Sequence, residues 1–300
     1  MARNKGWLQT RAEYAFAATL LYELEHLPLP LARRLANGAA GFLDRAMPKL
    51  RRVGLTNLRF AFPDLDPAQH NRILDGVFQS IARLLLATAR FPQLNASNIN
   101  DWIEYEGLEH YHQAKQNGRG VLVATAHLGN WELSAFAHAL MCEPMNVLVR
   151  PLDNPHVDRL VEQRRTLSGN RLIYKWDAAR AILKALKNNE AVGILIDQNT
   201  TPAEGVFVNF FGKLACAGSV FVKLAHHSGA PVIPGFALWD KSRKRYVLRF
   251  YPAIPMTGDV QEDTQRIHSI FEGIIREHPD QWMWIHRRWK TRPPGEPTLY

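Results

Sequence analysis

The sequence contains few cysteines, with only Cys142 and Cys216 among its 300 residues. Two cysteines in a chain of this length do not form a disulfide framework, which fits a protein of a reducing compartment. Both lie in apolar stretches without an adjacent base, and no Gly-x-Ser-x-Gly elbow is present. These absences argue against a covalent cysteine or serine nucleophile.

Patterns that hold metals, cofactors or nucleic acids are also missing. His226-His227 and His110-x-His112 have no further ligands at zinc spacing. No glycine-rich phosphate loop or dinucleotide fingerprint follows a predicted strand, and no helix-turn-helix, zinc-finger or RNA-binding signature occurs. We therefore predict no metal, no cofactor and no nucleic-acid partner.

The N-terminal region lacks an apolar run long enough to cross a bilayer unaided, which takes roughly 20 residues. Glu13 interrupts the apolar stretch and no convincing cleavage site follows it, so a signal peptide is not expected. Six apolar residues fall mostly on one helical face: Tyr14, Phe16, Leu20, Leu21, Leu24 and Leu27. Because Arg33-Arg34 and Arg51-Arg52 follow, the pattern predicts an interfacial helix on an anionic membrane surface. An ordinary helix packed on the domain is the alternative.

The composition gives ample material for a core and a clear excess of positive charge. Hydrophobic residues make up 46% of the chain, and the formal net charge is +9. Such a charge favours an anionic partner, for example an acidic membrane surface or a phosphorylated substrate.

From about residue 101 onward, short apolar strands alternate with helices, which indicates an α/β fold with a mainly parallel mixed sheet flanked by helices. We expect residues 1–50 to form an N-terminal helical, membrane-associating segment, and residues 51–300 the α/β domain, with a helical lead-in at 53–90. The expected strands are 102–106, 121–125, 146–149, 171–174, 191–196, 235–239 and 246–251. The expected helices are 67–89, 108–117, 131–141, 155–168, 177–188, 217–228 and 262–277. Residues 198–212 are expected to be a loop that covers the site or forms its wall.

One stretch, Gly120 to Leu133, brings a histidine to the junction between a strand and a helix. The apolar run Val121–Thr125 suits a strand buried on both faces. His127 follows it, and Glu132 lies five residues on, in the first turn of the next helix. A carboxylate can orient an imidazole while the other ring nitrogen faces a substrate, which is the arrangement of a general base.

Two further polar side chains follow predicted strands in the same way. Arg150 follows strand 146–149, and Asp197 follows strand 191–196. Because ligands of open α/β sheets bind outside the carboxyl ends of the strands, we expect His127, Arg150 and Asp197 to lie along one edge of the sheet.

The C-terminal segment 279–290 is dense in tryptophan and arginine. Aromatic rings between cations suit a membrane interface or a phosphate-bearing ligand. A C-terminus packed into the core is the alternative.

Several of these motifs resemble a known family. The hexad His127-Leu-Gly-Asn-Trp-Glu132 is similar to the His-x4-Asp/Glu signature of the glycerolipid acyltransferase superfamily. In this form it resembles the late acyltransferases of lipid A (lipopolysaccharide) biosynthesis, of the lauroyl and myristoyl transferase type. The stretch 229–234, Gly-Ala-Pro-Val-Ile-Pro, and the ending Trp282-x-Trp-x-His-Arg-Arg-Trp-Lys290 carry the same resemblance over most of the chain.

The resemblance implies an acyltransferase at the cytoplasmic face of a bacterial inner membrane. Its donor would be an acyl carrier protein or coenzyme A thioester, and its acceptor a hydroxyl of a glycolipid. His127 would act as general base, with Glu132 favoured slightly over Asp197 as the group that holds the imidazole. The implied substrate-binding residues are Arg150 for a phosphate, Asn130 with the first amides of helix 131–141 for the oxyanion, and Gln198.

Two other functions remain open at this point. The same transfer could act on another lipid, such as a lysophospholipid, a phosphatidylinositol mannoside or an amino-acid lipid. The fold could also serve a catalytically inactive membrane-binding protein, although His127, Glu132, Arg150 and Asp197 are all intact.

Overall fold

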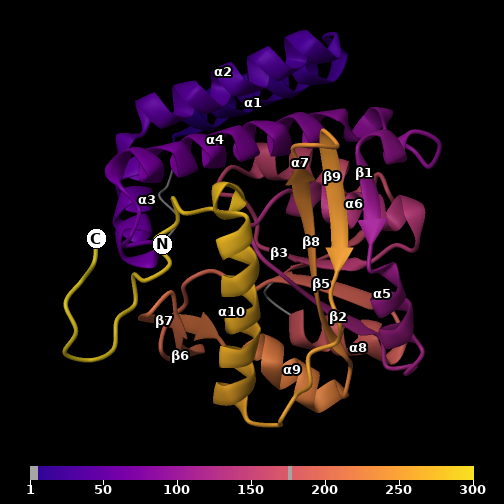
Figure 1. The fold of residues 1–300 in the computed structure, drawn as a ribbon. Coiled ribbons are helices and arrows are strands. Elements are labelled where there is room, and N and C mark those ends of the chain that lie inside the picture. The colour runs from indigo at the N-terminus through magenta and orange to yellow at the C-terminus, as the bar shows by residue number, and fades with distance from the viewer. Residues whose placement is uncertain (1–5, 175–177) are drawn as a thin grey trace.

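The computed structural model describes residues 6–174 and 178–300. It has the predicted α/β fold, in which helices flank a mainly parallel mixed sheet (Figure 1). The strands of the main sheet are β1 (Ile103–Glu106), β2 (Val121–Thr125), β3 (Asn146–Val149), β4 (Arg171–Tyr174), β5 (Ala191–Leu195), β8 (Val232–Asp240) and β9 (Arg245–Phe250). The predicted strands are therefore confirmed to within a few residues at each end.

The order of the strands places the chemically interesting strand ends side by side. The sheet runs β1-β9-β8-β2-β5-β3-β4. β2 pairs in parallel with β5 and β8, and β3 pairs in parallel with β5 and β4. Within the main sheet of the described residues, β8 and β9 are the antiparallel pair, as the predicted hairpin.

Alternate residues of the central strands serve two separate cores, as expected for a sheet buried on both faces. Leu122 and Ala124 of β2 face one core, while Val121 and Val123 face the other. The first core is covered by α8 (Ala178–Lys187), α9 (Val220–Ser228) and α10 (Val260–Glu277). The second is covered by α5 (Leu108–Lys115) and α6 (Trp131–Met141). The remaining helix of the sheet domain is α7 (Pro155–Thr166).

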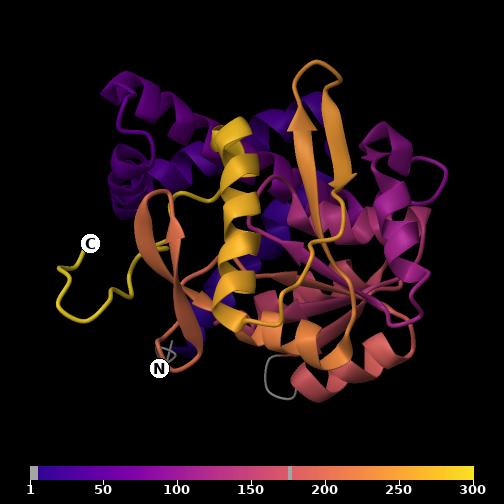
Figure 2. The ribbon, with the colours of Figure 1, turned by 60° about the horizontal axis from the view of Figure 1, so that its bottom comes forward.

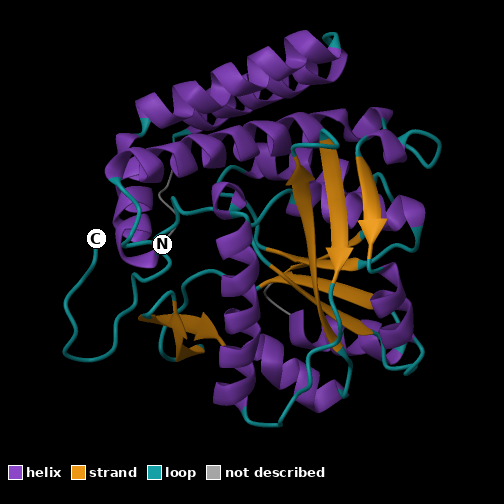
Figure 3. Ribbon diagram, in the orientation of Figure 1, coloured by secondary structure: helices purple, strands orange, loops and turns teal. Residues whose placement is uncertain are grey.

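The N-terminal helices form a layer over one end of the sheet (Figure 3). They are α1 (Trp7–His26), α2 (Leu29–Ala46), α3 (Pro48–Ala61) and α4 (Pro67–Arg90). α1 packs its Leu21 and Leu24 into this layer but leaves Trp7 and Phe16 more than 60% exposed. None of the helices in the described part of the chain is long and apolar enough to span a membrane.

The region after β5 differs from the prediction. Residues 198–212 were expected to be a loop, but Gly205–Phe210 (β6) and Lys213–Gly218 (β7) form an antiparallel hairpin beside α10 (Figure 2). The predicted start of the next helix at Ala217 is also wrong, because α9 begins at Val220. β7 was not predicted as a strand because its residues, Lys-Leu-Ala-Cys-Ala-Gly, have weak strand propensity. The turn places Phe211 and Gly212 at positive φ, 55° and 73°, and a phenylalanine rarely adopts this conformation.

The tryptophan-rich tail is part of the core. Trp282, Trp284 and Trp289 are at most 2% exposed, and Arg288 is fully buried. The indoles pack against Phe210 and Phe211 of the hairpin. The expectation of a tail at a membrane interface is therefore wrong for these rings, and the alternative of a core-packed C-terminus is confirmed.

Candidate active site

The predicted convergence at one edge of the sheet is present. His127 follows β2, Asp197 follows β5 and Arg150 follows β3, and these strands are consecutive neighbours in the sheet. Parallel pairing sends their carboxyl ends to the same edge. Residues about 70 positions apart in the chain therefore meet because of the strand order alone.

His127 and Asp197 form a close, directed pair. The Nδ1–H of His127 donates to Oδ1 of Asp197 at 2.8 Å, and the backbone N–H of His127 donates to Oδ2 at 3.0 Å. A carboxylate on Nδ1 fixes the tautomer in which Nε2 carries no proton. The ring itself is part-exposed, with 18% of the His127 side chain accessible. Nε2 is thus a proton acceptor, and in this structure it lies 3.2 Å from the side-chain amide of Gln198.

The Asp197 carboxylate is buried but held by several donors. Besides the two bonds from His127, the indole N–H of Trp282 donates to Oδ2 at 2.8 Å. Burial by itself would raise the pKa of Asp197, but the charge and hydrogen bonds of His127 and the Trp282 bond lower this pKa to about 2. Asp197 therefore stays ionised at neutral pH.

The loop that carries His127 is clamped by the C-terminal tail. Leu128 and Trp282 form an antiparallel bridge, and the backbone N–H of Met283 donates to the carbonyl of His127 at 3.0 Å. Gly129 adopts a positive φ of 65°, and a Cβ at this position would lie 2.0 Å from the carbonyl oxygen of Ala237. Only glycine fits there. The sequence analysis missed Trp282 as a site residue, although the tail motif Trp-x-Trp was a visible signal.

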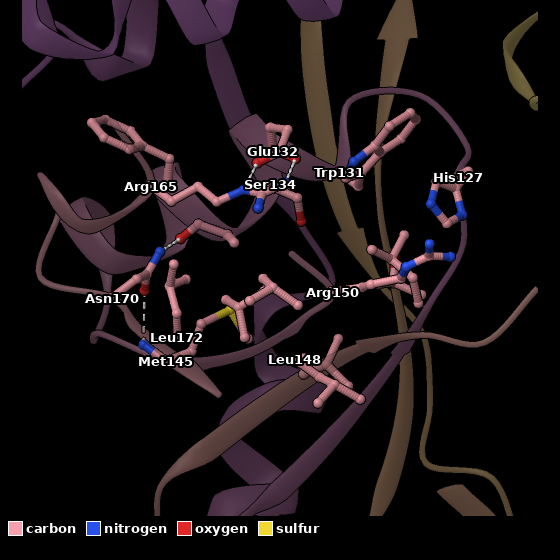
Figure 4. A pocket seen from close by; sticks show the side chains of 18 of the residues that line it. His127, Trp131, Glu132, Ser134, Met145, Leu148, Arg150, Arg165, Asn170 and Leu172 are labelled. Carbon is pink, nitrogen blue, oxygen red and sulfur yellow. Dashed lines mark hydrogen bonds and ion pairs between the residues drawn. The ribbon is translucent and has the colours of Figure 1, made fainter. Parts of the chain in front are cut away.

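Glu132 has a different partner from the one expected. Both of its carboxylate oxygens accept hydrogen bonds from the Arg165 guanidinium of α7, at 2.5 and 2.8 Å (Figure 4). Burial alone would lower the pKa of Arg165, but the hydrogen bonds and charge of Glu132 raise it. The preference for Glu132 as the group that holds the imidazole is therefore corrected in favour of Asp197. Because Glu132 lies in the first turn of a helix and Asp197 at the end of the neighbouring strand, the sheet brings the latter closer to Nδ1.

An apolar cavity of about 230 Å³ opens beside His127. Its walls are formed by side chains of β2, β3, β4, β5 and α6, including Val123, Val147, Leu172, Gly193 and Phe136. Figure 4 shows His127 and Trp131 at one end of this cavity and Arg165, Asn170 and Leu172 at the other. The rings of Trp131 and His127 meet edge to face, with centroids 4.9 Å apart. The cavity is a narrow, mostly apolar slot with an imidazole at one end.

The other expected substrate-binding residues fall into different settings. Arg150 lies at the cavity with 81% of its side chain exposed and only a 3.7 Å contact to Asp153. Gln198 is exposed, and its side-chain amide donates to Nε2 of His127 at 3.2 Å. Asn130 is fully buried, and its Oδ1 accepts from the backbone N–H of Leu133 as the N-cap of α6. Asn130 thus caps the helix and does not line the cavity.

A second hollow, lined by cationic and aliphatic side chains, lies beside Asn199, the residue after Gln198. It has a volume of about 440 Å³ and is lined by Lys49, Asn199, His286, Arg287 and Lys290, among others. Nε2 of His286 accepts a hydrogen bond from the backbone N–H of Asn199 at 3.3 Å. Three cations therefore line this hollow together with the His286 ring. Within residues 6–174 and 178–300, no group of three His, Cys, Asp or Glu side chains could hold a metal ion.

The sequence is similar to those of bacterial lipid A biosynthesis acyltransferases. The sequence model of the family described as "Bacterial lipid A biosynthesis acyltransferase" matches residues 5–291. The lipid A biosynthesis lauroyltransferase of Escherichia coli (strain K12) is 29% identical over 284 residues, covering 94% of this chain and 92% of the relative. The palmitoleoyltransferase of the same organism is 29% identical over 294 residues, covering 95% and 93%. Its myristoyltransferase is 24% identical over 269 residues, covering 89% and 82%.

Proposed function

This chain belongs to the bacterial lipid A biosynthesis acyltransferase family, and from that premise we propose that it transfers a fatty acyl chain from a thioester to a hydroxyl of a lipid A precursor. The donor is the thioester of acyl carrier protein or of coenzyme A. The observation that carries the proposal is the pairing of His127 with Asp197 at the end of an apolar slot.

His127 is the general base of this reaction. Its unprotonated Nε2 takes the proton of the acceptor hydroxyl as the oxygen attacks the thioester carbonyl. The tetrahedral intermediate then collapses, the carbon–sulfur bond breaks, and the imidazolium returns the proton to the leaving thiolate. Asp197 supports this cycle, because its buried negative charge stabilises the imidazolium and fixes the tautomer.

The oxyanion of the intermediate needs donors close to the imidazole. The N-terminus of α6 is a suitable source, since the first residue of this helix, Trp131, packs directly on the His127 ring. Backbone amides and the positive end of the helix dipole there stabilise developing negative charge. Asn130 contributes to this indirectly, by capping the helix.

The acyl chain of the donor occupies the apolar slot. The side chains that line it are mostly aliphatic or aromatic, which favours hydrocarbon. Arg150 is free to bind a phosphate of the donor at the entrance, because its contact with Asp153 at 3.7 Å is exposed and weak. Glu132 and Arg165 form a paired polar group within the slot wall, beside the acyl chain of the donor.

We assign the acceptor to the second hollow, beside Asn199. This hollow presents Lys49, Arg287 and Lys290, whose charges suit a phosphate group of a glycolipid. In this arrangement the acceptor hydroxyl and the thioester reach Nε2 of His127 from opposite sides.

The enzyme works at a membrane surface, which we place at the cytoplasmic face of the inner membrane. Support comes from the layer of N-terminal helices, where α1 exposes Trp7, Leu8, Phe16 and Tyr22 and α2 exposes Leu31 and Phe42. Large apolar side chains exposed beside arginines are typical of a helix that lies in the lipid interface.

Product analysis tests the proposal. Purified protein is incubated with acyl carrier protein and coenzyme A thioesters, and with three acceptors: a lipid A precursor, its dephosphorylated form and a lysophospholipid. Mass spectrometry should find acylated lipid A precursor, with less product when the acceptor phosphates are absent. Acylation of the lysophospholipid alone would assign the enzyme to another lipid, and no product with any acceptor would favour an inactive membrane-binding protein.

A further inference from the structure

A larger cavity, of about 1130 Å³, lies between α2, α4 and the β8–β9 hairpin. It is separate from the site at His127, because α4 stands between them. The α4 residues on the His127 side are Val77, Ser80, Ile81 and Leu84. Those that line the large cavity are Asp75, Phe78, Gln79, Ala82, Arg83 and Leu86. At 3.6 residues per turn, the two sets lie on opposite faces of the helix.

The inner wall of this cavity is aromatic. Phe78, Trp102, Trp239 and Tyr246 come from four different segments, and Phe78 and Tyr246 are almost completely buried. On the α2 side, small residues such as Ala36, Ala40 and Gly41 leave the space open. The wall therefore offers apolar surface to a ligand, and the volume exceeds the range of about 300–1,000 Å³ typical of small-molecule sites.

Five cations and three carboxylates, those of Asp44, Asp75 and Asp101, line the cavity, so positive charge is in excess. Among the described residues, Arg33, Arg45, Arg83 and Lys244 line it without an acidic side chain in ion-pair contact. A fifth cation, Arg51, is already paired with Asp44 and Asp75, at 2.7 Å each. Three of the four unpaired cations are exposed, whereas Arg83 is half-buried, with its guanidinium carbon 5.2 Å from the Trp239 ring centre. Such an arrangement attracts an anion to an aromatic floor.

One buried donor at the floor lacks an acceptor. The hydroxyl proton of Tyr246, a residue only 2% exposed, has no acceptor in the described part of the chain. Burial raises the pKa of Tyr246, and hydrogen bonding from Asn130 and Arg83 at its oxygen lowers it. A ligand oxygen beside this cluster would accept from the Tyr246 O–H and from the Arg83 guanidinium, which suits a phosphate.

We propose that this cavity binds the phosphate-bearing headgroup of an anionic membrane phospholipid. A free phosphate ion would satisfy the donors but would leave the aromatic wall and most of the volume empty. A headgroup carries its phosphate to Arg83 and Tyr246 and places its glycerol and first methylenes against Trp102 and Trp239. The helix that supplies the rim, α2, also exposes Leu31 and Phe42, so it has the surface of a helix lying at the lipid interface.

Binding of a soluble short-chain lipid tests this proposal without any acyl transfer. Dioctanoylphosphatidylglycerol is titrated below its micelle concentration, and binding is measured by calorimetry and by tryptophan fluorescence. The double variant Arg83→Gln/Lys244→Gln should bind at least tenfold more weakly, since it loses two charge-assisted contacts. Asn37→Trp, which fills the cavity from its exposed rim, should weaken binding as well.

The control removes the same charge outside the cavity. Arg34 and Arg52 are exposed on the same helical layer but do not line the cavity, so Arg34→Gln/Arg52→Gln should change affinity by less than twofold. Equal losses in both double variants would overturn the proposal, because binding would then follow net charge alone. Inorganic phosphate that binds as tightly as the lipid would also overturn it and would identify a site for a soluble phosphate.

Discussion

At the scale of single residues, the account depends on which carboxylate faces Nδ1 of His127. In the structure this is Asp197, at 2.8 Å, while both carboxylate oxygens of Glu132 accept hydrogen bonds from Arg165. Asp197 orients the imidazole through which His127 acts, so the two residues form one catalytic unit. The effects of replacing them on catalysis are therefore not additive.

A double-mutant cycle on kcat measures this coupling. Asp197→Asn should lower kcat about 10²–10⁴-fold, the range of a general base, because the wrong tautomer of His127 is then favoured. In a His127→Ala background the same change should have almost no further effect. Glu132→Gln should instead act independently of His127→Ala. Coupling of His127 with Glu132, and additivity with Asp197, would mean that Glu132 holds the imidazole during the reaction.

Residue identity alone could not have settled this point. The hexad places Glu132 near His127 in the sequence, whereas Asp197 is 70 residues away and becomes a neighbour only through the pairing of β2 with β5. Trp282 is further still, yet it donates to the same carboxylate. Sequence patterns suggested His127, Asp197 and Arg150 as candidates, and the sheet topology decided which side chains touch.

At the scale of elements, the strands under the apolar slot determine how much hydrocarbon fits. Gly193 of β5 lines the slot, and a Cβ there would lie 3.3 Å from the terminal methyl of Met145, which also lines it. The slot is thus open at this position because the strand carries glycine.

Gly193→Leu should shorten the acyl chain that the enzyme accepts. The added side chain occupies the slot, so kcat/KM for the longest accepted donor should fall at least tenfold while shorter donors are affected much less. Competition between donors of different length, read by mass spectrometry, measures this. Gly273→Leu is the control, because Gly273 is exposed on α10 with open space around its Cα. An equal loss for all chain lengths would show that the slot does not hold the acyl chain.

The N-terminal helices give a second prediction at this scale. Trp7→Ser/Phe16→Ser removes two exposed apolar side chains of α1, which are 69% and 66% accessible, without touching its buried Leu21 and Leu24. Flotation with vesicles of equal parts phosphatidylcholine and phosphatidylglycerol should recover several-fold less of this variant. The control Val220→Ser changes an exposed apolar residue of α9, far from α1 in Figure 1. If both variants float like the unchanged protein, α1 does not contact the membrane.

The prediction of helices and strands failed where the local propensity of a segment differs from the structure that its pairing with another strand imposes. The ends of β2, β3 and β5 could be predicted, because each strand is a short apolar run followed by turn or polar residues. β7 could not, because its residues have weak strand propensity and Ala217 was predicted to begin a helix, whereas pairing with β6 makes this segment a strand. The tail posed the same problem, since its tryptophans suit an interface as well as a core.

At the scale of the whole molecule, several histidines are buried in neutral form. Burial lowers the pKa of His138, His268 and His286 to about 4 each, from the ordinary value of 6.5. Between these values the unfolded chain binds protons that the folded chain excludes, so folding is linked to pH.

The free energy of unfolding should therefore fall as the pH is lowered from about 6.5 to 4. The stability that depends on the three neutral histidines is present in full above pH 6.5. Between pH 6.5 and 4, three histidines give the free energy of unfolding a slope of at most about 4 kcal/mol per pH unit. Urea denaturation at several pH values measures the slope. His268→Leu, at a site lined by Phe210 and Phe271, should lower the number of protons taken up on unfolding by about one, and so reduce this slope. A stability that rises toward pH 4 would contradict the buried neutral state.

The central claim is that His127, oriented by Asp197, removes the proton of the acceptor hydroxyl. The most direct test is the initial rate of acyl transfer to the lipid A precursor by the unchanged protein and by His127→Ala, at saturating donor and with equal folding confirmed by circular dichroism. We predict that the rate of His127→Ala falls about 10²–10⁴-fold. Transfer at the full rate in His127→Ala would contradict the claim.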